Sequence, residues 1–218
     1  MTNPVGVDHS LVFQEVRGLV LAGLLAALAG MVDAIGYLHL GGLFISYMSG
    51  NSTQLAVAVG EGSYREAGTI AELIAIFVLG AAAGQILADL SGRWRMTWVL
   101  TGVTMLLSTA AALAAPPEPM VLAMGALNAS LRRAGNIPVS LTFVTGVLVR
   151  FGQGLGDFLV GRATGLNWLL QAVPWVGLIA GATLGTIAYG WVAEAAIWFP
   201  VILAGLLAAC SAAMPETD

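Results

Sequence analysis

The chain has 218 residues and a formal net charge of −4, and 58% of its residues are apolar while only 9% are charged. Because an average soluble domain carries roughly 25% charged residues, too few polar groups are present to cover a soluble globular surface or to keep a chain disordered. The basic residues are all arginines and form no basic run, so the charge pattern gives no indication of a nucleic-acid partner.

Lipid is the solvent that this composition fits, and the lipid bilayer is the first expected partner. The mean hydropathy is +0.89, and the ranges 96–117, 163–193 and 195–215 contain no Asp, Glu, Lys or Arg. Each range exceeds the roughly 18 residues that indicate a membrane span. The sequence therefore predicts an all-α polytopic membrane protein.

Taken in chain order, the sequence predicts a short tail followed by eight apolar segments. Residues 1–16 are expected to form the N-terminal tail. Breaks rich in Gly, Pro, Ser and charged residues separate the segments, and no interval between them is long enough to fold in water. The segments are predicted at 17–38, 43–61, 68–90, 95–115, 119–137, 140–161, 168–192 and 195–214.

An offset of about 96 residues carries the first four segments onto the last four. This predicts a first repeat at 17–115 and a second repeat at 119–214, which together form one membrane domain. Residues 47–50 fall on 143–146, and both runs read aromatic, aliphatic, hydroxyl, glycine. Gly80 and Gly84 fall on Gly177 and Gly181, and such small residues four apart let helices approach closely. Shared membrane composition is the alternative explanation.

The positions of the arginines discriminate between two topologies, because positively charged loops favour the cytoplasm. If all eight segments span the membrane from a cytoplasmic N-terminus, Arg93, Arg95, Arg132 and Arg133 lie outside. If the second and sixth segments instead enter and leave the membrane on the same side, Arg65 is the one loop arginine that lies outside. We therefore predict a cytoplasmic N-terminus, six full spans plus two broken or re-entrant segments, and halves of opposite orientation; eight full spans is the alternative. Inverted repeats are common in secondary transporters.

The second segment is unusually polar from 46 to 54, which suits a broken helix buried in protein or facing water. A helix that begins after the run Ser49-Gly50-Asn51 would direct its first N–H groups into a cavity, where they would stabilise an anion. Thr145 belongs to the mirrored element of the second half. The alternative is an ordinary span whose hydroxyls bond its own carbonyls.

Asp33 lies late in the first segment, between the charge-free ranges 18–32 and 34–60. An ionised carboxylate in hydrocarbon costs about 2.5–3.5 kcal/mol, so it needs a partner, a water-filled cavity or a proton. Asn128 lies near the equivalent position of the second half, and Arg132 and Arg133 follow one turn later. We expect Asp33 to pair with one of these arginines, either as a proton-sensitive coupling element or as a permanent ion pair. Alternatively, Asp33 reaches the membrane boundary near Tyr37.

Further polar residues continue this series into the sixth segment. Arg150 either binds an anionic group, pairs with Asp157 or extends to lipid headgroups. No His or Cys pair has metal-ligand spacing, so neither a metal nor a cofactor is expected. The candidate substrate- or ion-binding residues are Asp33, Tyr37, Ser46, Ser49, Gly50, Asn51, Gln54, Asn128, Arg132, Arg133, Thr145, Arg150 and Asp157.

A family resemblance rests on the same residues. Residues 33–51, which read DAIGYLHLGGLFISYMSGN, resemble the signature of the YoaK-like family of bacterial integral membrane proteins, a domain of unknown function. The runs AMGALNA at 123–129 and VTG at 144–146 resemble its second motif, with Leu127 where the family usually has Gln. The resemblance covers nearly the whole chain. It implies a multi-pass protein of the bacterial inner membrane, sometimes suggested to transport small metabolites, without a known substrate.

These observations predict a secondary transporter or carrier for a small, anionic metabolite, with proton coupling through Asp33. One alternative is a structural or regulatory subunit that does not transport, in which the stripe at Gly177 serves association, including association into a homo-oligomer. A membrane enzyme built on Ser46, Ser49, Asp33 and His39 is the third hypothesis. Because the spacing of these residues matches no nucleophile elbow or triad, we expect no enzymatic activity.

Overall fold

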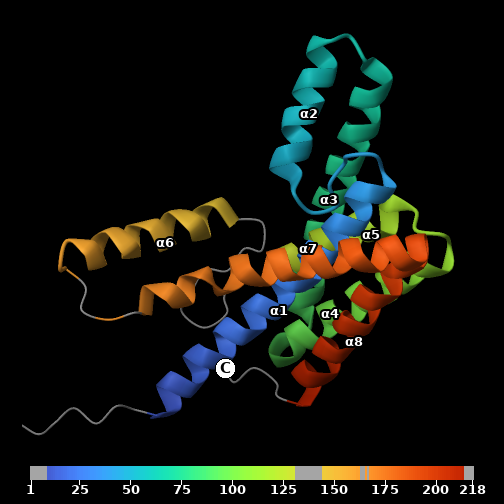
Figure 1. Cartoon of the computed structure of the whole chain (residues 1–218). Coiled ribbons are helices and arrows are strands. Elements are labelled where there is room, and N and C mark those ends of the chain that lie inside the picture. The colour runs from blue at the N-terminus through green and yellow to red at the C-terminus, as the bar shows by residue number, and fades with distance from the viewer. Residues whose placement is uncertain (1–8, 131–143, 163–164, 166, 214–218) are drawn as a thin grey trace, which may run out of the picture.

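The computed structural model describes residues 9–130, 144–162, 165 and 167–213, and every regular element within these ranges is a helix (Figure 1). The expected all-α class is therefore confirmed. The elements are α1 (His9–His39), α2 (Met48–Gly60), α3 (Tyr64–Leu90), η1 (Gly92–Trp94), α4 (Arg95–Ala112), α5 (Pro117–Ser130), α6 (Val144–Leu159), η2 (Asn167–Ala172), α7 (Val173–Val192), η3 (Ala193–Ile197) and α8 (Trp198–Ala213).

The α-helices follow the predicted segments, with two differences near the N-terminus. Helix α1 begins at His9, so helical structure extends into the segment that was expected to form the tail. The predicted segment 43–61 is not one continuous helix, because residues 40–47 form a loop before α2 begins at Met48. The break thus precedes the run Ser49-Gly50-Asn51, which forms the first turn of α2 instead of interrupting it.

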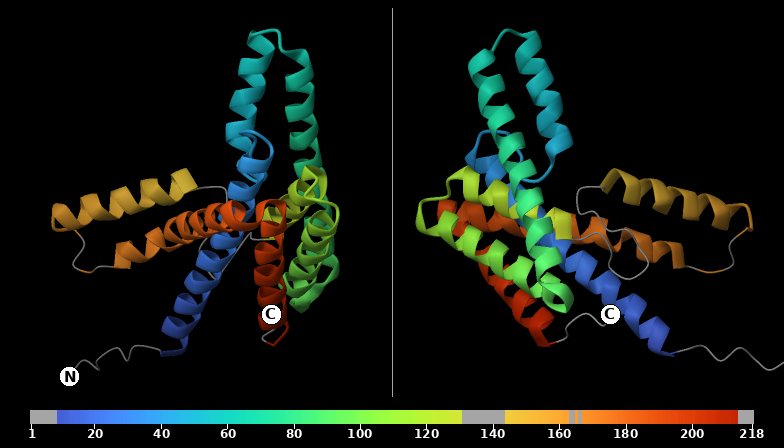
Figure 2. Two further views of the ribbon diagram at one scale, coloured as in Figure 1. Left: turned by 45° about the vertical axis from the view of Figure 1, so that its right-hand side comes forward. Right: turned by 180° about the vertical axis from the view of Figure 1, so that it is seen from behind.

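Two helix pairs pack with their backbones in close contact: α1 crosses α7, and α3 lies against α5 (Figures 1 and 2). Glycines make this approach possible. A Cβ added at Gly185 would lie 2.8 Å from the carbonyl oxygen of Met31, and one added at Gly84 would lie 2.5 Å from the Cα of Ala126. The contacts advance together along both helices of each pair, so the helices within each pair are parallel.

Helix α4 lies in the middle of the buried core, where it packs against α5 and α8. Leu100, Val103 and Leu107 recur at helical spacing on its buried face. The hydroxyls of Thr101 and Thr104 donate to carbonyls four residues earlier, at 2.8 Å and 2.7 Å. Because these polar groups are satisfied within their own helix, α4 is compatible with an apolar environment.

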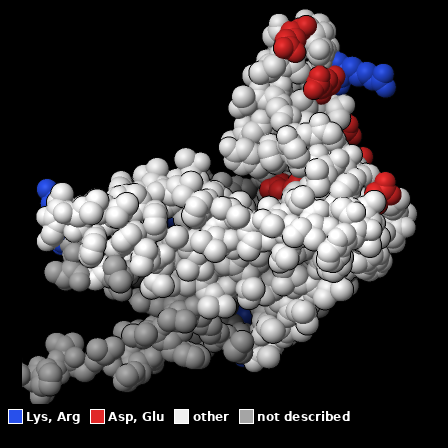
Figure 3. Space-filling model, viewed as in Figure 1, with Lys and Arg blue, Asp and Glu red and all other residues white. Residues whose placement is uncertain are grey.

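Two arms project from this core (Figures 1 and 2). One is formed by α2 and the first part of α3, and the other by α6 and η2, which pack against each other. Large apolar side chains such as Val57, Tyr64 and Leu159 are exposed on these arms. On the face shown in Figure 3, acidic side chains lie on the upright arm and beside its base, while most of the body is uncharged. Such a surface suits lipid better than water.

Three helical stretches of the described chain are long and apolar enough to cross a membrane: Gly18–His39, Tyr64–Leu90 and Trp168–Ala213. The last stretch contains both α7 and α8. Helix α2 has 13 residues, which gives it a length of about 20 Å. A bilayer core is about 30 Å thick, so α2 alone is too short to span it.

Candidate functional site

The loop at 40–47 turns the chain back over the C-terminal end of α1. Gly41 and Gly42 begin it with φ angles of +66° and +115°, a backbone conformation that favours glycine. Gly36 then leaves room on α1 for the side chain of Ile45, which is fully buried. These glycines therefore bring the second half of the loop into contact with α1 beside Asp33.

The carboxylate of Asp33 binds this loop through three hydrogen bonds. Its Oδ1 accepts the backbone N–H groups of Ile45 at 2.8 Å and Ser46 at 2.6 Å, and its Oδ2 accepts the Ser46 hydroxyl at 2.6 Å. Hydrogen bonds to a charged acceptor are short and strong. The sequence predicted that the first N–H groups of a helix after Ser49-Gly50-Asn51 would stabilise an external anion. The N–H groups that bind Asp33 belong instead to the loop residues Ile45 and Ser46, which precede α2.

From the other side, α2 holds the loop with two amide side chains. Asn51 is 0% exposed, and its Oδ1 accepts the N–H of Phe44 at 3.0 Å while its Nδ2 donates to the carbonyl of Phe44 at 2.7 Å. The Nε2 of Gln54 donates to the carbonyl of Gly42 at 3.0 Å. Asn51 and Gln54, predicted as ligand-binding residues, therefore satisfy the backbone of the loop.

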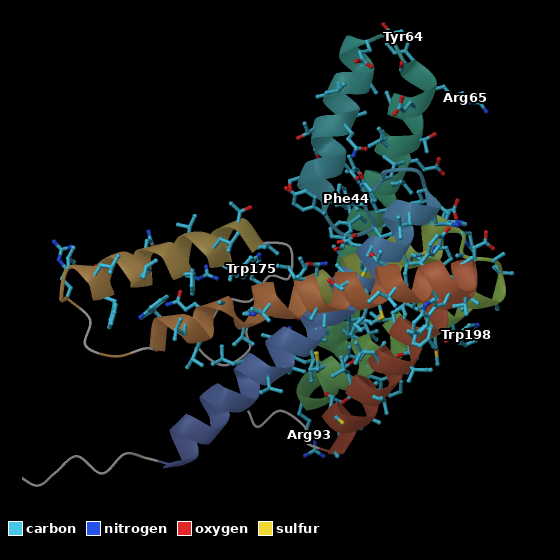
Figure 4. The ribbon with its side chains drawn as sticks, viewed as in Figure 1. Phe44, Tyr64, Arg65, Arg93, Trp175 and Trp198 are labelled. Atoms are coloured by element: carbon cyan, nitrogen blue, oxygen red, sulfur yellow. The ribbon has the colours of Figure 1, made fainter. Side chains whose placement is uncertain are left out.

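Three aromatic rings gather where the loop meets α1 and α2. The ring centroids of Tyr37 and Phe44 are 4.9 Å apart, and those of Phe44 and Tyr47 are 5.2 Å apart with an edge-to-face geometry. Figure 4 shows Phe44 at the base of the upright arm. A Cβ added at Gly50 would lie 2.5 Å from the ring of Tyr47. The role of Gly50 is therefore to make room for this ring.

A cavity of about 480 Å³ opens between this loop and the second half of the chain. Its volume falls in the range of small-molecule sites. The carboxylate of Asp33 is the one charged group among the described residues that line it. The lining residues are Gly30, Asp33, Ala34, Tyr37, Leu38, Phe44, Ser46, Tyr47, Val144, Thr145, Leu178, Ala182 and Thr186.

Four of the predicted candidates thus meet at one cavity: Asp33, Tyr37, Ser46 and Thr145. Phe44 and Tyr47 also line it. They belong to the motif at 33–51 that the sequence singled out, although neither was predicted as a site residue. Thr186 was missed, because it lies in an apolar segment without a polar cluster to mark it. Its hydroxyl donates to the carbonyl of Ala182 at 2.9 Å.

The remaining candidates within the described residues do not line the cavity. Ser49 is exposed on α2. On α5, the Nδ2 of Asn128 donates to the carbonyl of Met124 at 2.8 Å, and its Oδ1 is buried without a partner among the described residues. Arg132 and Arg133 lie outside the described residues, so their pairing with Asp33 stays a prediction.

On α6, both charged candidates are exposed. The carboxylate of Asp157 lies 3.9 Å from a guanidinium nitrogen of Arg162. The described ion pair of Asp157 is therefore with Arg162, and the three alternatives for Arg150 stay predictions. His39, considered for an enzyme site, lies 3.7 Å from Glu194. Because Ser46 donates to Asp33 while His39 contacts η3, these residues do not assemble into a Ser–His–Asp arrangement.

A chain whose described part is all helical, with an apolar surface and several helices long enough to cross a membrane, has the character of an integral membrane protein. The chain belongs to the family described as "Protein of unknown function (DUF1275)", whose model matches residues 21–210. It is also 40% identical over 203 residues to a UPF0700 transmembrane protein of Rhizobium meliloti (strain 1021), covering 91% of this chain and 88% of that protein. No solved structure matches the chain. The YoaK-like resemblance is thereby confirmed as membership of an uncharacterised membrane family.

Proposed function

We propose that the protein is a secondary carrier for a small molecule in the bacterial inner membrane, and that Asp33 couples transport to protons. The observation that carries this proposal is the cavity between the two halves of the chain. Its walls come from α1 and the loop at 40–47 on one side and from α6 and α7 on the other. Sites at the interface of two halves are typical of transporters that alternate access by moving one half against the other.

The pairing of helices supports an origin by duplication and is compatible with inversion. Each close pair takes one helix from each half, because α1 packs against α7 and α3 against α5. Helices α2 and α6 begin 96 residues apart, at Met48 and Val144. If each half has three spans, the halves have opposite orientations, and α1 is then parallel to α7 while α3 is parallel to α5. The glycine contacts have this polarity.

The arrangement of the first half also favours three spans over four. Helix α2 is too short to cross the bilayer, and it extends the chain beyond the end of α1 before α3 returns (Figure 1). Figure 4 shows Arg65 at the tip of the upright arm and Arg93 at the opposite end of α3, the end at which α1 begins. Under the positive-inside rule, this favours a cytoplasmic N-terminus.

Protonation of Asp33 would couple to the shape of the cavity through the loop. The ionised carboxylate accepts two backbone N–H groups and one hydroxyl, whereas a protonated carboxyl has less capacity to accept hydrogen bonds. The loop, which joins α1 to α2 and lines the cavity, would therefore be held less tightly by Asp33.

Flux into proteoliposomes tests this function. The wild-type protein, Asp33→Asn and the control Ser52→Ala should be compared across a panel of small metabolites, with and without a pH gradient. Ser52 is exposed on α2 and donates to the carbonyl of Met48, away from the cavity. We expect gradient-dependent flux in the wild type and the control, and its loss in Asp33→Asn. Equal gradient dependence in all three proteins would exclude the coupling role, and an absence of flux would exclude the carrier.

One observation behind the alternative of a partner subunit has another explanation. The stripe of Gly177, Gly181 and Gly185 was expected to serve association between chains. In the structure, α1 covers this stripe at Gly23, Ala27 and Met31. The stripe is therefore used for packing within the chain.

A further inference from the structure

We propose that the cavity binds a small organic cation, an alkylated amine or quaternary ammonium, and not the anion that the sequence suggested. This inference rests on the proposed function in taking the cavity as the substrate site. It concerns the chemistry of the walls, which the carrier proposal leaves open. Charge, aromatic surface and the absence of a metal-binding set in the described chain each contribute to it.

The charge of the cavity comes from Asp33. Its three described hydrogen-bond donors, two amides and one hydroxyl, are neutral, so they stabilise the carboxylate without cancelling its charge. No Arg, Lys or His is among the described lining residues. In a weakly screened site an anionic ligand would be repelled by this carboxylate, whereas a cation would be attracted.

The aromatic rings favour an organic cation over a hydrated metal ion. Tyr37, Phe44 and Tyr47 form one continuous wall, and aromatic faces attract ammonium groups within about 6 Å of the ring centroid. Ala34 and Leu178 add apolar surface that suits alkyl substituents. Among the described residues, no group of three or more His, Cys, Asp or Glu side chains could hold a metal ion.

A cation and a proton would compete for Asp33, which fixes the direction of the pH dependence. Protonation removes the charge that attracts the ligand, so binding should weaken as the pH falls. The other titratable groups on the cavity wall are the phenols of Tyr37 and Tyr47. His39, further along α1, lies beside Glu194 of η3. α7 contributes Leu178, Ala182 and Thr186, and α6 contributes Val144 and Thr145, none of which is titratable.

Three ligands of the same shape and different charge test the inference on the purified full-length protein. Choline carries a trimethylammonium group, 3,3-dimethyl-1-butanol is its neutral isostere, and 3,3-dimethylbutanoate is an anion of similar shape. We expect choline to bind at least about tenfold more tightly than the alcohol, and the butanoate to bind most weakly. Choline binding to the wild type should also weaken, and never strengthen, as the pH falls, a measurement that needs no variant.

Variants then assign the effect to the named residues. Asp33→Asn should abolish the preference for choline, and Tyr47→Leu should weaken choline binding about threefold or more while leaving the alcohol unaffected. Ser52→Ala serves as the control. If Asp33→Asn does not fold, Tyr47→Leu and the wild-type pH series still decide the question.

The outcomes separate this inference from the carrier function. Three results would overturn the cation site: equal binding of the three ligands, tighter binding of the butanoate, or no binding of choline. They would do so even if proteoliposomes showed an anion flux that depends on Asp33 and thereby supported the carrier. Charge-selective binding of choline that depends on Asp33 would support the cation site, even if proteoliposomes showed no flux and the carrier proposal failed.

Discussion

Replacing Asn51 by Ala tests the loop anchor, because Asn51 satisfies both backbone polar groups of Phe44. Asn51 is fully buried, so Ala leaves a donor and an acceptor without partners. Each unsatisfied buried group costs about 1–3 kcal/mol, which gives a loss of about 2–6 kcal/mol in stability. For a chain of this size, 1 kcal/mol corresponds to about 2–4 °C in Tm, so we expect a decrease of at least about 4 °C.

Thermal unfolding in detergent, followed by tryptophan fluorescence, measures this decrease. Thr53→Ala is the matched control, because Thr53 is an exposed neighbour on α2 whose hydroxyl donates to the carbonyl of Ser49. Asn51→Asp sharpens the test: an ionised carboxylate can accept from the N–H of Phe44 but repels its carbonyl, so the stability deficit should shrink in acid, where the carboxyl can donate. If Asn51→Ala unfolds at the same temperature as Thr53→Ala, the anchor has been assigned to the wrong residue.

Two further predictions concern packing and topology. Gly181→Leu should prevent α1 from packing against α7, so no monodisperse protein should be recovered in size-exclusion chromatography. Gly190→Leu is the control on the same helix. It should be recovered normally, because no atom lies near the Cβ position of Gly190. Single cysteines at Ser63, after α2, and at the exposed Gly165, after α6, in a Cys210→Ala background because Cys210 is exposed, should be labelled from opposite sides of the membrane; labelling from one side would indicate eight full spans and contradict three spans in each half.

The positions of the helices could be predicted because membrane helices carry continuous apolar runs. The start of α2 could be placed only to within a few residues, because Ser49, Gly50 and Asn51 read equally well as a break or as a first helical turn. The polar residues in this run suggested a ligand site. In the structure, Asn51 and Gln54 bind the backbone of the loop at 40–47. These contacts form because the chain reverses at Gly41 and Gly42, and no local sequence pattern shows which side chains such a reversal brings together.

The partner of Asp33 illustrates the same limit. An ionised carboxylate in an apolar helix is costly, so Asp33 needs a partner that stabilises its charge. Opposite charge suggested Arg132 and Arg133, which follow one turn after Asn128 in the second half. The described partners are instead the N–H groups of Ile45 and Ser46, twelve and thirteen residues later in the chain. Backbone amides carry no sequence signal, so pattern reasoning that considers only side chains cannot find them.

The difference between Asp33 and Asn128 then bears on how many charged sites the chain has. If the halves arose by duplication, Asn128 lies near the position equivalent to Asp33, and it carries no charge. Asn128 donates within its own helix to Met124, whereas Asp33 holds a loop and faces a cavity. A neutral amide can neither attract a cation by charge nor release a proton. A duplicated fold with one ionisable member of the pair therefore has one charge-dependent site per chain, and saturation binding of choline should approach one molecule per polypeptide.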